Sequence, residues 1–528
     1  MPGVPVTSRA PAAAAGAPPR SGQATAGASP ATTAAGRLVW AAVAGLVAVG
    51  VVLRFVTTSP LWLDEAMSVN IAKLPLGDIP AALRHDGHPP LYYFLLHGWM
   101  AVFGQSDVAV RALSGVFAVA TLPLTWLVAR RVGGRAAAVA GLVVLATNPY
   151  AVRYATETRM YSLVMVLVLL GWLAVTAAAE RATPARLAAV AVLSGTLALT
   201  HYWAFYLAAA TAVVLLARRR WAVVAALVAG GVLFLPWLPS FLEQAAHTGT
   251  PWAGAVRPTT VLMATVLDFA GGLPSEAQLL AFVLVGLAVL GLAGRAVDGR
   301  RVELDVRTRP EVRRELVVAG LTLAVGCLVG YATASAFASR YAAVVFPLFV
   351  LAVAVGATRL ASPATRAVVL AAVAVLGLVG GARNVLEDRT QGAELAAAIE
   401  STGADGDLVV FCPDQLAPAV DRELADGIVR VPFPDPASSP ERVDWYDYAD
   451  RNQAADVGSF AADVLARAGD RAVYLVIAPG YETFDEKCEA LQATLTAARP
   501  GAAVLVPADP RVFEHAGLVR FPAAPPGG

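Results

Sequence analysis

Two adjacent carboxylates, Asp64 and Glu65, are the residues best suited to acid–base chemistry. They follow an apolar run that ends near residue 53 and begin the segment DEAMSVNIAKL. At the boundary between water and lipid a carboxylate is partly desolvated, which raises its pKa toward a useful range. Asp64 could therefore take a proton from an attacking hydroxyl. The alternative is structural, because Asp64 could cap the helix that follows, with Glu65 favoured in its first turn.

A second polar cluster lies further along the same loop. His85, Asp86 and His88 precede two prolines in the run RHDGHPPLYYF. Imidazole and carboxylate groups could bind a metal ion or a phosphate here, and the prolines are equally typical of a plain turn into a helix. His201 begins a similar short junction with two aromatic neighbours. An aromatic belt at the membrane surface accounts for those neighbours without any ligand.

Charged residues also stand at two other junctions between apolar runs. NPYAVRYATETRMYSL holds Glu157 and Arg159 where the next run begins, and pairing or substrate contact is the usual reason to keep ionisable residues there. ASRYAAVVFPLF holds Arg340, whose planar guanidinium suits a phosphate at headgroup depth. For Arg153 and Arg340 the alternative is snorkelling, in which the stem lies in lipid and the charge reaches water.

The composition indicates a membrane protein. Of 528 residues, 57% are hydrophobic and 15% charged, whereas a soluble domain carries roughly a quarter charged residues. The mean hydropathy is +0.62. The net charge of +1 points to no particular partner. With no basic tract, zinc-ligand spacing or nucleic-acid module, the sequence excludes nucleic-acid binding as the function.

Apolar runs predict about eleven transmembrane helices. A span needs roughly 20 apolar residues to cross about 30 Å of hydrocarbon. The runs are 38–53, 110–129, 136–151, 160–179, 187–200, 203–217, 221–239, 277–294, 316–335, 342–358 and 367–382. Two more stretches, 89–103 and 259–270, are placed along the outer surface. The first, with its aromatic residues, then becomes an interfacial helix.

Charge asymmetry is the reason for that placement. It puts the dense arginine clusters near 130–135, 181–186, 218–220, 295–314 and 359–366 on one face, which the positive-inside rule makes cytoplasmic. The sequence therefore predicts a multi-pass protein of the plasma membrane with a cytoplasmic N-terminus. The C-terminal region and the loop 54–109 lie outside the cell in this prediction.

The two ends of the chain differ from the apolar part. Residues 1–36 are rich in Ala, Pro, Gly, Ser and Thr, which predicts a disordered cytoplasmic tail. After the membrane domain, 37–383, the pattern in 384–528 changes to short apolar runs that alternate with helix-like stretches. That alternation predicts an extracytoplasmic α/β domain with a mostly parallel sheet. Its strands are expected in DLVVF, GIVRV, AVYLVIA and AAVLVPA, and its Cys412 and Cys488 allow at most one disulfide, whose formation is left open.

In order along the chain, the motifs resemble those of the family 39 glycosyltransferases of the GT-C superfold. These are relatives of the protein O-mannosyltransferases and of the lipid A aminoarabinose transferases. The motifs are the outer-loop DE pair, the HPPLYY helix, R-x-x-S at Arg111 to Ser114, YATETRMYSL, and SRY before a proline-containing span. The resemblance covers roughly residues 38–360. It leaves out the N-terminal tail and the C-terminal domain.

The resemblance implies roles for particular residues. Asp64 would be the general base, and Glu65 beside it would shape the catalytic pocket. The implied substrate-binding residues are His88 and Tyr93 in the HPPLYY motif, Glu157, Arg159 and Tyr161 in the second outer motif, and Arg340 with Tyr341 near the donor phosphate.

The implied reaction moves a sugar from a polyprenyl-phosphate donor to an acceptor hydroxyl on the outer face. Asp64 would deprotonate the acceptor as it attacks the anomeric carbon, and a single base without a covalent intermediate predicts inversion. Arg159 and Arg340 are the candidate cations for the departing phosphate. A divalent metal ion could share that task, and the sequence does not decide between them. The sugar, of mannose type or a pentose, stays open, as does the acceptor, which could be a protein, a lipid or a polysaccharide.

Two other functions are compatible with many spans. A membrane transporter or flippase of lipid-linked or cell-envelope substrates is the first, although carriers concentrate polar residues near the midplane and often show repeats. Here the charges lie at the outer junctions, and the predicted midplanes are Ala, Val and Leu. The second is a non-catalytic protein that binds lipid or cell wall through its C-terminal domain.

Overall fold

The computed structural model describes residues 30–250, 254, 256–272, 274–305, 310–333, 335, 337–481 and 483–523. Residues 1–29 of the predicted tail lie outside the described residues, and 30–36 are the first residues of helix α1 (Pro30–Leu53). The chain forms two compact units, Met1–Ala44 and Gly45–Gly528. The second unit contains every residue of the predicted site.

Most of the chain is a helical membrane domain. Within the described residues, seven helices are long and apolar enough to cross a membrane. They are α1, α5 (Asp107–Thr147), α7 (Tyr161–Glu180), the stretch Trp221–His247, α14 (Ser275–Ala293), α15 (Pro310–Ala332) and α17 (Pro363–Leu386). Shorter apolar helices are α8 (Pro184–Ala198), α9 (Trp203–Ala217), α16 (Phe346–Thr358) and α4 (Leu91–Phe103). The protein is thus a polytopic helical membrane protein.

Helix α5 contains two predicted spans, because its regular backbone is interrupted at Gly133 and Gly134, the latter at φ +73°. Every other predicted span also coincides with an apolar helix, and 221–239 is divided into α10 (Trp221–Ala229), α11 (Gly231–Phe234), η1 (Leu235–Trp237) and α12 (Leu238–His247). Eleven spans nevertheless remain a prediction, because length and composition single out only seven helices among the described residues.

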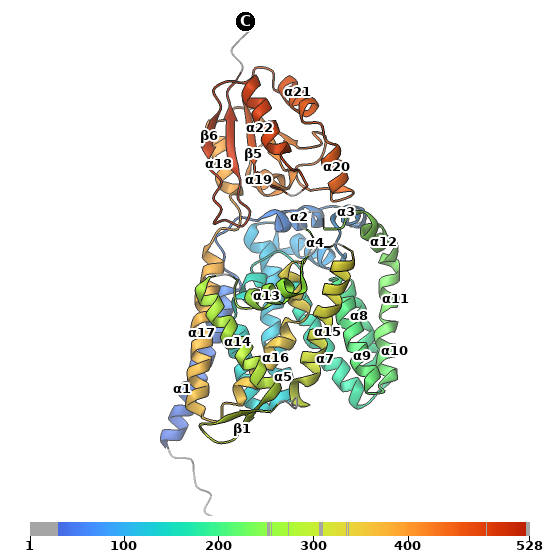
Figure 1. Cartoon of the computed structure of the whole chain (residues 1–528), viewed down its shortest axis with the longest axis vertical. Coiled ribbons are helices and arrows are strands. Elements are labelled where there is room, and N and C mark those ends of the chain that lie inside the picture. Colours follow the sequence, from blue (N-terminus) through green and yellow to red (C-terminus); the bar gives the residue numbers. More distant parts are fainter. Residues whose placement is uncertain are drawn as a thin grey trace, which may run out of the picture. The chain divides into compact units, whose positions relative to one another are not determined.

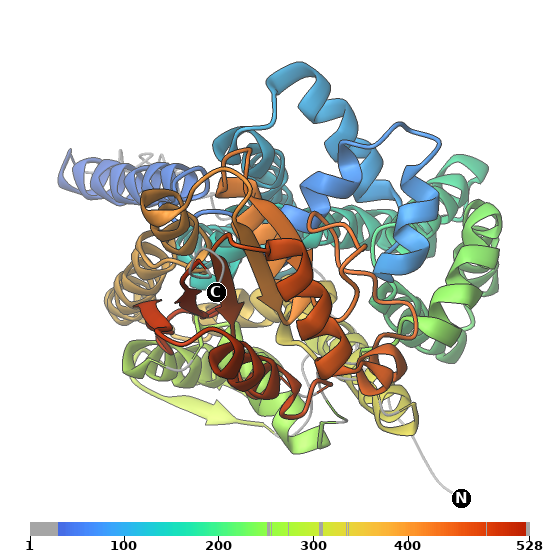
Figure 2. The ribbon, with the colours of Figure 1, turned by 90° about the horizontal axis from the view of Figure 1, so that it is seen from above.

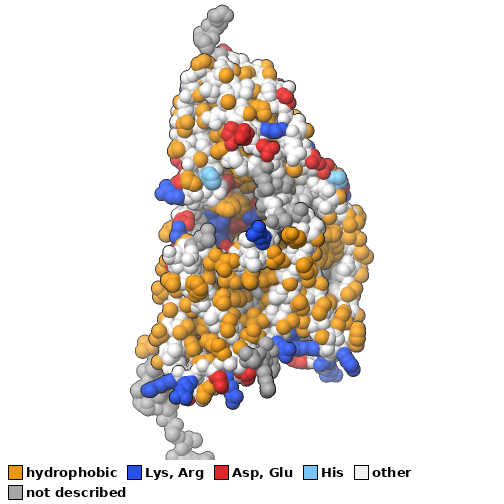
Figure 3. All heavy atoms as spheres, in the orientation of Figure 1, with side chains coloured by type: hydrophobic (Ala, Val, Ile, Leu, Met, Phe, Trp, Pro, Cys, Tyr) orange, Lys and Arg blue, Asp and Glu red, His pale blue; other side chains and the backbone are white. Residues whose placement is uncertain are grey.

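The surface of the helical domain suits lipid. Large apolar side chains face outward along it, among them Phe282 with 78% of its surface exposed and Val228 with 72%. Apolar side chains cover this part of the molecule, while Lys and Arg gather at the end away from the sheet (Figure 3). A short hairpin, β1 (Gly294–Ala296) and β2 (Val302–Leu304), joins α14 to α15 at that basic end (Figure 1).

Short helices form the opposite end of the bundle, next to the sheet (Figure 1). They are α2 (Leu63–Ala72), α3 (Ile79–Asp86), α4, α6 (Pro149–Ala155), α13 (Pro258–Asp268) and the 3₁₀ turn η2 (Ser339–Val344). Helix α3 ends at Gly87, whose φ of +84° is the left-handed conformation that glycine adopts without strain. The chain then turns through the two prolines into α4.

The C-terminal residues form a five-stranded sheet in the order β4-β3-β5-β7-β6, with helices packed against it (Figure 2). The strands are β3 (Leu408–Cys412), β4 (Val429–Pro432), β5 (Val473–Ile477), β6 (Ala503–Val506) and β7 (Gly517–Phe521). The helices are α18 (Gly392–Thr402), η3 (Asp414–Leu416), α19 (Ala417–Glu423), α20 (Tyr448–Ala454), α21 (Val457–Ala468) and α22 (Lys487–Ala498). Strands β3 and β5 are buried along their whole length, as expected where both faces of a sheet are covered.

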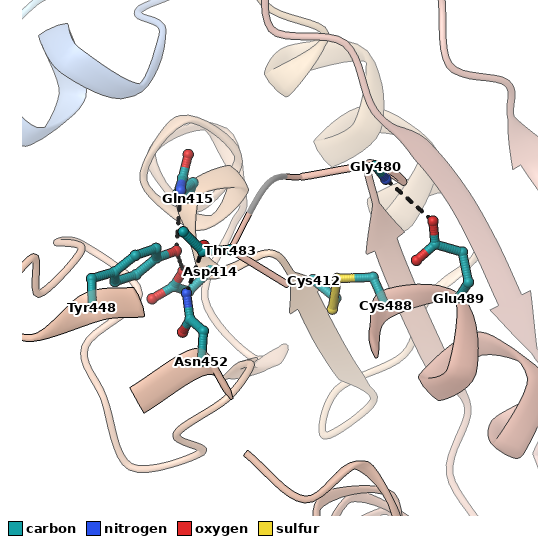
Figure 4. The surroundings of a disulfide bond; sticks show 9 residues. All are labelled: Cys412, Asp414, Gln415, Tyr448, Asn452, Gly480, Thr483, Cys488 and Glu489. Carbon is teal, nitrogen blue, oxygen red and sulfur yellow. Dashed lines mark hydrogen bonds between the residues drawn. A yellow bond between two sulfur atoms is a disulfide. The ribbon is translucent and has the colours of Figure 1, made fainter. Parts of the chain in front are cut away.

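The sheet is less parallel than the sequence predicted. Strands β4, β3 and β5 are parallel, but β7 pairs antiparallel with both β5 and β6. The four predicted strands are present, and β7, near the end of the chain, was not predicted. The open question of the cysteines is also answered, because Cys412 and Cys488 form a disulfide (Figure 4).

Candidate active site

Asp64 is the second residue of α2 and lies between two arginines. Its Oδ2 is 3.8 Å from an Nη atom of Arg159 and 3.5 Å from one of Arg340. Although that oxygen is buried, it accepts no hydrogen bond from any residue that the structure describes. The side chain as a whole is 17% exposed. Asp64 therefore combines an acceptor oxygen, two nearby cations and limited access to solvent.

Glu65 faces a different set of partners and is completely buried. Arg111 donates from Nε to Oε1 at 2.7 Å and from Nη2 to Oε2 at 2.6 Å, and the backbone N–H of Thr158 donates to Oε1 at 2.8 Å. Arg389 lies 3.8 Å away. Burial alone would raise the pKa of Glu65, but the two arginines and these hydrogen bonds outweigh it and lower the pKa. Through these bonds the Glu65 carboxylate links α2 to α5 and to the loop before α7.

His88 connects the second polar cluster to Arg159. Its Nδ1 is 2.8 Å from Asp86 Oδ2, and its Nε2 is 2.7 Å from an Nη atom of Arg159. Because a guanidinium can only donate, Nε2 is the acceptor and Nδ1 carries the hydrogen that Asp86 accepts. Tyr93 donates to the same Asp86 oxygen at 2.8 Å. The pKa of Asp86 is raised by burial but lowered overall by His88, Arg159 and Tyr93.

Arg159 is the centre of this network and is only 2% exposed. Besides His88, it donates to the hydroxyls of Ser68 at 3.0 Å and Tyr93 at 3.4 Å. These partners come from α2, the turn before α4, and α4 itself. Residues from the outer loop 54–109 and from the motif YATETRMYSL therefore meet at one guanidinium.

Aromatic rings surround the other arginine. The guanidinium of Arg340 lies 5.7 Å from the ring centroid of Trp62 and 5.9 Å from that of Tyr341, distances typical of cation–π contacts. His201 lies 5.5 Å from Tyr341 and 5.8 Å from Tyr161 between ring centroids. Burial is the main cause that lowers the pKa of His201 to about 3, and the positive charges of Arg159 and Arg340 lower it further, so its ring is neutral.

Glu157 is the predicted residue that lies apart from this cluster. It is buried, and its contact is with Arg153, which donates at 3.3 Å. Burial raises the pKa of Glu157 despite that arginine and Arg389. Arg153, for which snorkelling was the alternative, is thus the partner of a buried carboxylate.

Sequence reasoning missed several parts of the site. Trp62 and Ser68 carried no motif of their own, although Trp62 stands two residues before the acid. Arg111 was noted only for its R-x-x-S spacing, and His201 only as a junction. Their contacts join residues far apart in the chain, and a local pattern does not report such pairs.

The donor set does not favour a metal ion. Among the described residues, no group of three or more His, Cys, Asp and Glu side chains is placed to hold one. The two cations beside Asp64 are arginines, which would repel a divalent cation bound there.

An apolar cavity lies between α7, α8, α9 and α15. Its lining is largely Leu, Val and Ala, with Arg314 and Glu315 also contributing. Two of its lining residues, Leu197 and Ala204, are joined to His201 by backbone hydrogen bonds of 3.0 Å each. In Figure 3, acidic and basic side chains are visible in the hollow between the sheet and the helical domain.

Comparisons with known proteins found one matching family model and several similar structures. Residues 87–241 match the family model "Dolichyl-phosphate-mannose-protein mannosyltransferase". ArnT from Cupriavidus metallidurans in the apo state has a similar structure, with a TM-score of 0.59 and 15% identity over 92% of this chain and 98% of that one. ArnT bound to undecaprenyl phosphate gives 0.54 and 15% over the same shares. No curated protein matches the sequence.

The fold is therefore the GT-C-like fold of ArnT: a multi-pass helical membrane domain followed by a small α/β region. The matched family model includes His88, Tyr93, Glu157, Arg159 and Tyr161. Asp64 and Arg340 lie outside its bounds. Their assignment to the site rests on the geometry and on the resemblance of the sequence motifs.

Proposed function

We propose that this chain is an integral membrane glycosyltransferase that moves a sugar from a polyprenyl-phosphate donor to an acceptor hydroxyl. The observation that carries the proposal is the position of Asp64, a carboxylate beside two arginines at the end of the helical domain nearest the sheet. The ArnT-like fold and the family model over 87–241 support the reaction class.

Asp64 acts as the general base. Its Oδ2 accepts the proton of the acceptor hydroxyl while the hydroxyl oxygen forms a bond to the anomeric carbon. The bond between that carbon and the phosphate oxygen breaks, and the bonding electrons leave with the polyprenyl phosphate. Attack and departure on opposite faces invert the anomeric centre.

Arg159 and Arg340 stabilise the phosphate as it gains charge. Preorganised cations in a dry site are effective at this task because they need no reorganisation during the reaction. His88 holds Arg159 through Nε2, and Asp86 fixes the ring of His88 from the other side. Tyr93, Tyr161 and Tyr341 line the substrate site around these arginines.

Glu65 is a positioning residue in this scheme. Its oxygens are occupied by Arg111 and Thr158, which favours a role in orienting α2 over contact with the reacting atoms. Glu157, paired with Arg153, belongs to the loop before α7 that carries Arg159 into the site.

The apolar cavity near His201 suits a segment of the isoprenoid chain of the donor. An isoprenoid chain has no polar group that needs a partner, so it can pack against Leu and Val side chains. Its phosphate then reaches Arg340 and Arg159 at the headgroup level. The structure of ArnT bound to undecaprenyl phosphate supports this class of lipid.

The proposed orientation places the N-terminus in the cytoplasm and the α/β domain outside the plasma membrane. The basic end of the bundle supports it through the positive-inside rule. Polyprenyl carriers deliver sugars to that outer face, where the acceptor is a protein, lipid or polysaccharide hydroxyl. We propose a domain division at 1–36, 37–383 and 384–528.

The test is sugar transfer by the reconstituted protein. Purified protein in liposomes receives a radiolabelled polyprenyl-phosphate mannose or pentose together with membrane extract as the acceptor source. We expect wild type to transfer label and Asp64→Asn to lose at least about a hundredfold in rate, as a lost general base implies. Asp78→Asn, an exposed acid in the same loop, is the matched control and should retain full activity.

Comparable transfer by Asp64→Asn would remove Asp64 as the base. A wild type that translocates labelled lipid without transferring sugar would instead support the flippase alternative.

A further inference from the structure

The helix that carries Asp64 lacks an N-terminal cap of its own. The N-cap residue of α2 is Trp62, and no side chain of the helix supplies the cap hydrogen bond. An uncapped first turn leaves backbone N–H groups that need partners. The partner of the Leu63 N–H is Glu514, whose Oε1 accepts at 3.1 Å from 451 residues away.

Glu514 is itself firmly held in the C-terminal region. Its backbone N–H donates to the carbonyl of Arg389 at 2.8 Å, and its carbonyl accepts from Gln391 at 3.2 Å. Its side chain is buried. The neighbouring Phe513 ring meets Trp62 edge-on, with centroids 5.2 Å apart. Cap and aromatic contact therefore come from one short segment between β6 and β7.

Arg389, whose carbonyl accepts the backbone N–H of Glu514, also lies near Glu65 on the other side of Asp64. Arg389 donates to the carbonyl and the hydroxyl of Thr156 at 2.6 Å each and lies 3.8 Å from Glu65. Glu65 in turn is tied to Arg111 of α5. The residues on both sides of Asp64, Leu63 and Glu65, are thus both linked to the chain that leads into or out of the sheet.

Helix α2 is buried against two cores at once. Trp62, Leu63 and Met67 belong to the hydrophobic cluster of the sheet, with Leu408 and Leu475 among its members. On the other side, Ala66, Val69 and Ile71 belong to the core of the helical domain. A helix wedged between two cores cannot shift unless one of them moves.

We infer that the C-terminal α/β domain holds the general base in place, with Glu514 as the positioning residue that fixes the first turn of α2. The domain is then a structural part of the catalytic unit, whatever it also does for the acceptor. This inference rests on the proposed role of Asp64. It concerns the placement of Asp64 and adds no step to the reaction.

The chemistry of Glu514 defines the right substitutions. Burial raises its pKa to about 8, opposed by Thr390 and the Leu63 N–H, so the carboxyl is mainly protonated at neutral pH. Glutamine therefore preserves its size, its neutral state and its acceptor oxygen. Alanine removes the acceptor.

A matched control is available in the same region. Glu489 accepts a hydrogen bond from the backbone N–H of Gly480 at 3.2 Å, next to the disulfide (Figure 4). Both residues are glutamates that satisfy a backbone donor, but the donor of Glu489 lies within the sheet domain. Glu489→Ala tests the loss of such a bond without any effect on α2.

The experiment combines hydrogen–deuterium exchange of the peptide covering 60–72 with transfer kinetics of the full-length protein. For Glu514→Ala we expect faster exchange in the first turn of α2 and a kcat at least about tenfold lower, because small displacements of a catalytic group are costly. The KM for the polyprenyl-phosphate sugar and the binding of undecaprenyl phosphate should stay within twofold. Glu514→Gln should restore both readouts, and Glu489→Ala should resemble wild type.

Each contrary result is informative. Wild-type exchange in Glu514→Ala would contradict the cap, and faster exchange with unchanged kcat would contradict the positioning role. Failure of Glu514→Gln to restore kcat would contradict the acceptor function of the side chain. If Glu514→Ala does not fold, Phe513→Ala loosens the same segment while Glu514 remains, and it should give the same two changes to a smaller extent; wild-type values for both would overturn the inference.

The experiment distinguishes failure of this inference from failure of the proposed function. If wild type transfers no sugar from any donor, the exchange arm still reports whether Glu514 fixes α2.

Discussion

At the scale of single residues, Asp64 and Glu65 are neighbours with opposite environments. Asp64 has a buried oxygen without a hydrogen-bond donor among the described residues, while Glu65 has three hydrogen bonds and a second arginine nearby. The sequence predicted the pair but not this division, because it depends on Arg111 and Arg389. One acid is therefore expected to serve catalysis and the other stability.

The division predicts opposite effects of the two amide substitutions. Glu65→Gln should destabilise the protein by about 3 kcal/mol, because Arg111 would be left buried without its counter-charge. Asp64→Asn should unfold at nearly the wild-type temperature and lose transfer. Thermal unfolding in detergent measures the difference. Glu441→Gln, which removes only a partly exposed pair with Lys73, should change stability by less than about 1 kcal/mol.

A Glu65→Gln protein of wild-type stability would contradict a stabilising role for the Glu65–Arg111 ion pair. So would a loss of stability in Asp64→Asn as large as that in Glu65→Gln.

At the scale of elements, the length of the apolar runs predicted the helices of the membrane domain well. Each apolar run became a helix, because a segment in lipid must satisfy its own backbone hydrogen bonds. The stretch 89–103, placed outside the spans, became α4, whose Tyr93 contributes to the Asp86 network. Strand β7 could not be predicted from its short run, because its place in the interior of the sheet is defined by its partners β5 and β6.

The turn between α3 and α4 is the element most sensitive to a small change. Gly87 has a φ of +84°, and an added Cβ would lie 3.0 Å from the Thr248 hydroxyl oxygen. Gly87→Ala should cost about 1–2 kcal/mol in strain and displace the adjacent His88. Because His88 orients Arg159, we expect a higher KM for the donor together with a lower unfolding temperature.

The matched control is Gly77→Ala in the same loop, where a Cβ meets nothing within 4 Å. It should leave both quantities unchanged. A wild-type KM in Gly87→Ala would show that a change in this turn does not affect donor binding.

At the scale of the whole molecule, the site is assembled from segments that no local pattern connects. Leu63 and Glu514 are 451 residues apart, and Arg389 reaches Thr156 across 233. The sequence placed the C-terminal region on the same side as Asp64 but predicted no contact between the two. Its packing around α2 became evident only from long-range contacts, which sequence spacing does not encode.

The contact between Glu514 and the first turn of α2 should make the stability of the protein depend on pH. The pKa of Glu514 is raised by burial to about 8 from an ordinary value of 4.5, so the folded protein favours the protonated form. The stabilisation is complete below the unfolded pKa and is lost as pH rises through about 8, because the unfolded state ionises first. Between pH 6 and 8 the wild type should lose about 2 kcal/mol from this group.

Glu514→Gln cannot ionise and should escape that loss. We expect its unfolding temperature relative to wild type to increase from pH 6 to pH 8 and to level off above pH 9. Asp414, whose buried carboxyl has its pKa raised to about 7, is present in both proteins and cancels in the difference. Glu489→Gln should follow the wild-type profile. A constant difference between Glu514→Gln and wild type across this range would mean that Glu514 is already ionised where it caps α2.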